Sequence, residues 1–254
     1  MLLNKIYLLI SPLIHNSKRI TKMRTLTFLK LLIIVLFIGF STNANAQVGP
    51  REIPEGFVYA KEIMPSLRTD LRYYSSNNFV GNPIDGYTKP KCILTKEAAE
   101  ALKNVQDEFA RLGFGLMVFD AYRPQRAVDH FIRWSKDSMD TKMKEEFYPN
   151  IKKKDLFEEG YISEKSGHSR GSTVDVTVVS LRTGHILDLG GPYDYFDKKS
   201  SVSYTNITKN QRAIRSMLQR RMLKHGFKYY PKEWWHFTLA KEPYPDTYFD
   251  FPIE

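Results

Sequence analysis

Cysteine is almost absent from this sequence. Cys92 is the only cysteine among 254 residues, so no disulfide can form within the chain. A free cysteine usually behaves as a small apolar side chain, and we expect Cys92 to pack in the core. Internal repeats and low-complexity tracts are also absent. Once the predicted leader described next is set aside, about 208 residues remain, which suits one domain with a proper core.

Long apolar runs are scarce as well. The run Leu31–Phe40 follows a basic stretch and precedes the sequence Ser-Thr-Asn-Ala-Asn-Ala. A basic start, a short apolar core and an Ala-x-Ala ending are typical of a secretory signal peptide, here cleaved after Ala46. A run of about ten to fifteen apolar residues is too short to span a bilayer comfortably. We therefore predict a signal peptide at residues 1–46 and an exported, periplasmic domain at residues 47–254, with no stable membrane insertion after cleavage.

A strong charge of one sign is also lacking once the leader is removed. The whole chain has 38 basic and 28 acidic residues, a formal net charge of +10, and six of the basic residues lie in the leader. The mature part therefore carries a net charge of +4. This excess is too small to indicate nucleic-acid binding, and no arginine-rich or aromatic-interleaved basic motif supports it.

The apolar pattern that is present predicts an α+β fold, a single domain with an antiparallel β-sheet flanked by helices. Helices are expected where apolar residues recur at helical spacing behind a capping residue, and strands where short apolar or alternating runs occur. The predicted helices extend from Thr95 to Gly113, from Pro124 onward and from the Thr208–Gln211 capping box to Gly226, with charged, helix-prone sequence over Asp137–Tyr161. The predicted strands are Phe57–Met64, Phe114–Phe119, Thr173–Ser180 and Trp235–Leu239.

The stretch Asn77–Tyr87 is expected to be a loop, because it contains Gly81, an Asn-Pro pair and an Asp-Gly pair. It carries two aromatic side chains, Phe79 and Tyr87. Two interpretations remain open for them: the loop is a lid over a site, or it covers an edge of the core.

The residues that indicate chemistry are two histidines and two acids. His168 lies in a turn that leads through Gly171 into the strand Thr173–Ser180, and Asp175 lies on the polar face of that strand. His236 lies on the more polar face of the last strand. Two imidazoles and one carboxylate are the ligands of a catalytic zinc site, with a position left open for water. The spare carboxylate of Glu233 can act as a base on that water.

Other candidates are weaker. His130, His185 and His225 lack a comparable setting and are interpreted as structural; His225 falls in the last turn of a helix, where its charge suits the dipole. Arg123 lies between a strand and a proline, so its guanidinium is displayed at a strand-to-helix corner. An arginine at such a corner either points into a cleft or makes a surface salt bridge.

Taken together, these motifs resemble the zinc D-alanyl-D-alanine peptidases, and nearly the whole mature chain is similar to their D-Ala-D-Ala dipeptidase (VanX-type) branch. The metal motif is Ser-x-His-x-x-Gly-x-x-x-Asp, from Ser166 to Asp175, followed by Glu-x-x-His, from Glu233 to His236. Further matches are Asn78-Phe79-Val80-Gly81, Asp85-Gly86-Tyr87, Asp120-Ala121-Tyr122-Arg123-Pro124 and the ending from Glu242 to Pro252. Thr173 is a departure, because the family usually has alanine there.

The resemblance implies a role for each of these positions and a hedgehog/DD-peptidase-like fold with a zinc-bearing cleft. His168, Asp175 and His236 would bind one Zn²⁺ per chain. Glu233 would be the general base, and Arg123 would stabilise the oxyanion. Substrate binding would fall to Asp194, which matches the family position that holds the substrate's ammonium, with assistance from Ser166.

The function predicted on these grounds is zinc-dependent hydrolysis of the D-alanyl-D-alanine dipeptide to two D-alanines in cell-wall peptide turnover. Two alternatives remain open: a D,D- or L,D-carboxypeptidase acting on peptidoglycan stem peptides, and a non-catalytic wall-binding module. The presence of both Glu233 and Arg123 disfavours the second, because a binding module needs neither. The sequence decides neither the oligomeric state nor the upper limit of substrate length.

Overall fold

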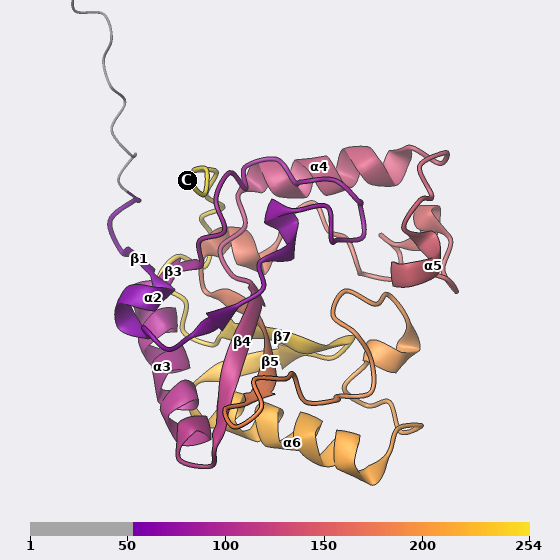
Figure 1. The fold of residues 1–254 in the computed structure, drawn as a ribbon. Coiled ribbons are helices and arrows are strands. Elements are labelled where there is room, and N and C mark those ends of the chain that lie inside the picture. Colours follow the sequence, from indigo (N-terminus) through magenta and orange to yellow (C-terminus); the bar gives the residue numbers. More distant parts are fainter. Residues whose placement is uncertain (1–52) are drawn as a thin grey trace, which may run out of the picture. The chain divides into compact units, whose positions relative to one another are not determined.

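The computed structural model describes residues 53–254, so the predicted signal peptide lies outside the described residues. Its central feature is a five-stranded sheet in the order β2-β4-β5-β7-β6 (Figure 1). The strands are β2 (Arg68–Thr69), β4 (Phe114–Asp120), β5 (Thr173–Ser180), β6 (Phe227–Tyr230) and β7 (Glu233–Leu239). A separate two-stranded sheet pairs β1 (Phe57–Tyr59) with β3 (Ile93–Thr95).

The predicted antiparallel sheet is confirmed for four of the five strands. β4 pairs with β5, β5 with β7 and β7 with β6, all antiparallel. The edge strand β2 instead runs parallel to β4, so the sheet is mixed. β2 has two residues and no alternating pattern, which is why the sequence did not indicate it. The α+β fold class is correct.

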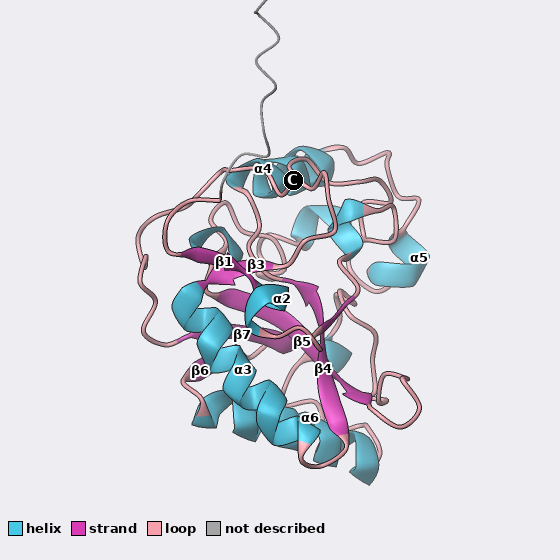
Figure 2. Cartoon of the chain, turned by 60° about the vertical axis from the view of Figure 1, so that its left-hand side comes forward, coloured by secondary structure: helices cyan, strands magenta, loops and turns pink. Residues whose placement is uncertain are grey.

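Two long helices cover one face of the sheet. α3 (Lys96–Ala110) and α6 (Lys209–Lys224) lie beside the strands in Figure 2 and bury a shared apolar core with the valines of β5. Thr95 caps α3, as predicted, by accepting a hydrogen bond from the backbone N–H of Ala98. Cys92 is buried in this core as a free thiol.

A second, aromatic core lies under α4 (Gln125–Lys136), the helix that follows Pro124. The loop Asn77–Tyr87 packs here, with Phe79 against Phe131 and Trp134. The side chains of Phe79 and Tyr87 are buried, which favours the interpretation that this loop covers the core. Phe79 also lines the cavity described below, so the loop contributes to the site from its inner side.

Two local predictions were wrong. The first strand ends at Tyr59, because a short helix, α2 (Ala60–Ile63), begins at Ala60 and packs in the core. The charged stretch 137–161 contains only the one-turn helix α5 (Lys144–Phe147) and the 3-10 turn η2 (Lys153–Asp155). Lys144 and Lys153 instead donate hydrogen bonds to backbone carbonyls of this stretch and hold it as an irregular loop.

The remaining short elements are three 3-10 turns: η1 (Arg72–Tyr74), η3 (Gly167–Arg170) and η4 (Lys198–Ser200). Within residues 53–254, none of the helices combines the length and the hydrophobicity that crossing a bilayer requires.

The capping box of α6 provides a test of this fold. The Thr208 side chain accepts from the backbone N–H of Gln211, and the Gln211 side chain accepts from the backbone N–H of Thr208. Thr208→Ala should lower the free energy of unfolding by about 0.5–2 kcal/mol, because a backbone donor loses its partner. Urea denaturation measures the change. Thr205→Ala, which alters an exposed threonine just before the helix, is the control and should have little effect; equal stability of both variants would contradict the capping role.

Candidate active site

Asp175 and His236 are brought together by strand pairing. β5 and β7 are antiparallel neighbours, and their register places Asp175 directly opposite His236. Side chains that lie opposite each other on one face of an antiparallel pair come within contact distance. The sequence predicts that Asp175 and His236 each lie on the polar face of a strand, and the structure shows that both lie on the same face of the sheet. This polar face is nevertheless inside the protein, because both faces of β5 are covered and Thr173, Asp175 and Thr177 are all buried.

His168 reaches the same point from the turn η3. Ser166 caps this turn by accepting a hydrogen bond from the backbone N–H of His168. The turn ends at Gly171, whose φ of +79° is one that side-chain-bearing residues rarely adopt. A Cβ at Gly171 would also lie 2.2 Å from the ring of Phe57. Both the backbone angle and the close contact with Phe57 therefore require glycine at position 171.

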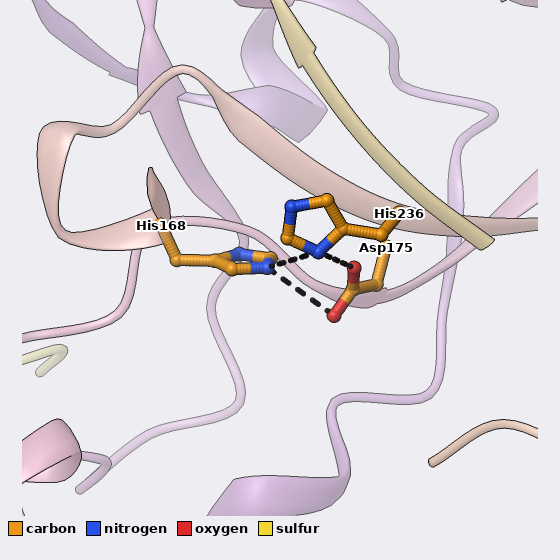
Figure 3. A group of neighbouring side chains, drawn as sticks. All are labelled: His168, Asp175 and His236. Atoms are coloured by element: carbon orange, nitrogen blue, oxygen red, sulfur yellow. Dashed lines mark hydrogen bonds and ion pairs between the residues drawn. The ribbon is translucent and has the colours of Figure 1, made fainter. Parts of the chain in front are cut away.

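The three side chains converge in the geometry of a metal site (Figure 3). His168 Nε2 is 3.4 Å from His236 Nδ1 and 3.4 Å from Asp175 Oδ2, and His236 Nδ1 is 3.2 Å from Asp175 Oδ1. All three potential ligand atoms lie within 4.8 Å of one another. Among the described residues, no other group of three such side chains has this geometry.

The protonation states suit a metal ion. His168 Nδ1 lies 2.7 Å from the carbonyl oxygen of Ala121 and must donate to it, which leaves a lone pair on Nε2 facing the other ligands. Burial lowers the pKa of His168, although Asp175 opposes the shift. Burial would raise the pKa of Asp175, but the two neighbouring imidazoles hold that pKa well below its usual range. A neutral imidazole and an ionised carboxylate are the forms that bind metal.

One buried atom provides an independent test of fit. Asp175 Oδ1 is buried, and its near polar neighbour, His236 Nδ1 at 3.2 Å, does not meet the geometry of a hydrogen bond to it. Leaving a buried carboxylate oxygen without a partner costs free energy, and a cation between the three side chains would remove that cost. The donor set and this unpaired oxygen therefore both fit a divalent metal ion.

Glu233 lies next to His168, Asp175 and His236, and the pKa of its carboxyl group is raised. Its Oε2 lies 3.4 Å from His236 Nδ1, and its side chain is buried. Burial, together with the charge of Asp175, raises the pKa of Glu233 to about 8, with Arg123 opposing the shift. A carboxyl group with a pKa near neutrality can both accept and donate a proton at working pH.

Arg123 points inward from the corner between β4 and α4. Its guanidinium donates to Asp120 Oδ2 at 2.9 Å, lies over the ring of Tyr73, and approaches Asp175 Oδ2 to 3.8 Å. Only 13% of its side chain is exposed. The surface-salt-bridge interpretation is therefore wrong, and the predicted position at a strand-to-helix corner facing a cleft is correct.

Asp194 also lines the cavity, in a backbone conformation that residues with a side chain rarely adopt. Its φ is +57°, the only positive φ among the described non-glycine residues. Its Oδ2 accepts a hydrogen bond of 2.8 Å from Tyr73 Oη. Burial and the nearby charge of Asp175 raise the pKa of Asp194 well above its usual range. A buried acid that is hard to ionise becomes easier to ionise when a cation, such as an ammonium group, binds beside it.

A single cavity of about 390 Å³ collects all seven predicted side chains. It is lined by Arg123, Ser166, His168, Asp175, Asp194, Glu233 and His236. The three histidines interpreted as structural do not line this cavity. Of these, His130 accepts a hydrogen bond from the backbone N–H of Asp85, and His225 lies 3.3 Å from the carboxylate of Glu108.

Sequence reasoning missed a layer of supporting residues. Asp120 holds Arg123 and accepts from Tyr87 at 2.7 Å, and Tyr193 donates to Asp175 Oδ2 at 3.0 Å. Asp120 could have been suspected, because it begins the Asp-Ala-Tyr-Arg-Pro motif. Tyr73 carries no local signal, since its partner Asp194 is 121 residues away along the chain.

Comparison with known proteins agrees with this geometry. A family model described as D-ala-D-ala dipeptidase matches residues 54–254. The chain belongs to this family of peptidases. The D-alanyl-D-alanine dipeptidase of Streptomyces coelicolor is 44% identical over 197 residues, covering 78% of this chain and 98% of that protein. The enzyme of the same description from Enterococcus faecalis is 41% identical over 198 residues, with the same coverage.

A more distant relative and one solved structure also match. The D-alanyl-D-alanine dipeptidase of Escherichia coli is 28% identical over 179 residues, covering 70% of this chain and 82% of that protein. A solved structure of the LdcB LD-carboxypeptidase covers 76% of this chain and 72% of that chain, at 18% identity and a TM-score of 0.39. That likeness is too distant to carry an argument about function.

Removal of one ligand tests the metal site directly. His168→Ala should abolish binding of a stoichiometric divalent metal ion, because two remaining ligands cannot hold it in this geometry. Metal content after dialysis, measured by atomic emission, gives the result. The exposed His185 provides the matched control: His185→Ala should keep its metal, and retention of metal by both variants would exclude the site.

Proposed function

We propose that this protein is a zinc dipeptidase that hydrolyses D-alanyl-D-alanine to two D-alanines in cell-wall peptide turnover. The observation that carries the proposal is the placement of Glu233 beside the group His168, Asp175 and His236 in one cavity. Membership in the D-Ala-D-Ala dipeptidase family supports the substrate.

His168, Asp175 and His236 would hold the zinc. When bound, it would supply a Lewis acid for a water molecule and for the peptide carbonyl. Glu233 accepts a proton at its carboxylate from the attacking water and delivers it to the leaving amine. A cation bound beside Glu233 would lower the raised pKa of that buried carboxyl group, so that the carboxylate form needed to accept the proton would be present at neutral pH. The guanidinium of Arg123 stabilises the negative charge that develops on the carbonyl oxygen.

Asp194 and Ser166 would bind the substrate's free amino group. Asp194 offers a carboxylate held in place by Tyr73, and Ser166 adds a hydroxyl at the cavity wall. An ammonium group bound to Asp194 would offset the cost of ionising that buried acid. We expect a dipeptide to bind with its amine at Asp194 and its carbonyl at the candidate metal ligands, because the cavity offers an anion for the amine and a cation site for the carbonyl.

The substrate itself is tested with purified, zinc-loaded protein and D-Ala-D-Ala. Release of D-alanine, followed by a coupled D-amino-acid oxidase assay, is the expected result. L-Ala-L-Ala serves as the comparison and should be cleaved far more slowly. Faster cleavage of a pentapeptide stem than of the free dipeptide would instead favour a carboxypeptidase, and binding of stem peptides without turnover would favour a wall-binding module.

The role of Glu233 is tested by an isosteric change. Glu233→Gln should retain the metal but lose at least about 100-fold in kcat, because a general base contributes about 10²–10⁴-fold to rate. Metal content and kcat are measured on the same preparation. Glu97→Gln, at an exposed position in α3, is the control for loss of an acid and should keep full activity. A Glu233→Gln enzyme with normal kcat would remove Glu233 from the mechanism.

We also propose that the protein is exported to the periplasm. The support is the basic start, the apolar run Leu31–Phe40 and the Ala-x-Ala ending at residue 46. An exported enzyme would meet dipeptides released from the wall rather than precursors in the cytoplasm, which favours a role in recycling.

A further inference from the structure

One side of the catalytic cavity is formed by the segment Phe157–Lys165, called the wall segment below. Six of its nine residues line the cavity: Phe157, Gly160, Tyr161, Ile162, Ser163 and Lys165. The wall segment contains no helix or strand, and six of its nine residues are exposed. A segment with few buried contacts opens at a lower free-energy cost than the sheet beneath it. Whatever ties it down therefore affects the shape of the cavity.

Tyr230 ties the wall segment to the metal centre. It is the last residue of β6 and lines the same cavity. Its hydroxyl donates a hydrogen bond of 3.0 Å to the carbonyl oxygen of Gly160. Its ring lies edge-on to the imidazole of His236, with the ring centroids 5.6 Å apart. One side chain thus contacts both a metal-ligand candidate and the wall of the cavity.

The backbone at Gly160 lies very close to the hydroxyl of Tyr230. Gly160 has a φ of +72°, and a Cβ there would lie 2.9 Å from Tyr230 Oη. Any other residue at this position would strain the backbone and crowd the tyrosine hydroxyl. Next to it, Lys232 donates to the carbonyl oxygen of Glu159 and lies 3.5 Å from its carboxylate. The end of β6 and the turn that follows it therefore hold two successive residues of the wall segment, Glu159 and Gly160.

We propose that Tyr230 is a positioning residue that keeps the wall segment closed over the cavity and thereby limits the size of the peptide that can enter. This inference rests on the proposed dipeptidase function. The ring of Tyr230 supports His236, and its hydroxyl holds the wall, so the two roles are separable by mutation. Loss of the hydroxyl alone leaves the ring contact in place.

Tyr230→Phe is the test. Loss of one hydrogen bond shifts an opening equilibrium by about 2- to 10-fold, so the wall segment should open more often by that factor. The ratio of kcat/KM for L-Lys-D-Ala-D-Ala to kcat/KM for D-Ala-D-Ala should rise by a similar factor. Zinc content should stay unchanged, because the ring remains against His236. An unchanged ratio would overturn the size-limiting role.

The neighbouring tyrosine is the matched control. Tyr229 lies on the same strand, is 40% exposed and does not line the cavity. Tyr229→Phe should leave the substrate ratio at the wild-type value. A rise of the ratio in both variants would show a general loosening of β6 and would overturn the specific role of Tyr230.

Hydrogen exchange separates this inference from the proposed function. Amides of residues 157–165 should exchange about 2- to 10-fold faster in Tyr230→Phe than in the wild type or Tyr229→Phe. This readout needs no turnover. If the wild type fails to cleave D-Ala-D-Ala, the proposed function falls, and the exchange rates alone decide whether Tyr230 holds the wall. Equal exchange rates in the wild type, Tyr230→Phe and Tyr229→Phe would show that Tyr230 does not hold the wall segment.

Discussion

The site depends on one cross-strand pair. Asp175 and His236 face each other because β5 and β7 are antiparallel in a single register. A shift of that register by one residue would turn every side chain of the strand to the opposite face. The valines of β5, buried against α3 and α6, prevent the shift, since it would place Asp175 in the apolar core. The hydrophobic core thus fixes the geometry of the candidate metal ligands, and two of its members, Ala121 and Tyr193, hydrogen-bond His168 and Asp175 directly.

The cavity around this pair is lined by more acidic than basic side chains. Asp175, Asp194 and Glu233 line the cavity, while Arg123 and Lys165 are the cationic side chains described along its walls. Arg123 is already paired with Asp120, so it offsets little of the negative charge. Buried carboxylates in excess are costly unless a cation compensates them. A divalent metal ion and the ammonium group of a peptide would together supply that compensation, which is the chemistry that a dipeptidase needs.

Much of the architecture could be predicted from the sequence, and the errors have physical reasons. The helix after Thr95 and the capping box at Thr208 were predicted correctly because their signals are local. The helix-prone stretch 137–161 is mostly irregular, because Lys144 and Lys153 satisfy backbone carbonyls that a helix would have used. β2 was missed because two residues carry no periodic pattern.

The sequence by itself singled out the candidates for the chemistry: His168, Asp175, Glu233 and His236 stand out by type and spacing, and strand alternation assigns Asp175 and His236 to polar faces. Only the tertiary structure decided that these faces coincide, that Arg123 is buried rather than at the surface, and that Tyr73, Tyr193 and Tyr230 support the site. The reason is range. Periodicity and capping act over a few neighbouring residues, whereas a hydroxyl that holds a carboxylate or a carbonyl far along the chain leaves no mark in its own local sequence.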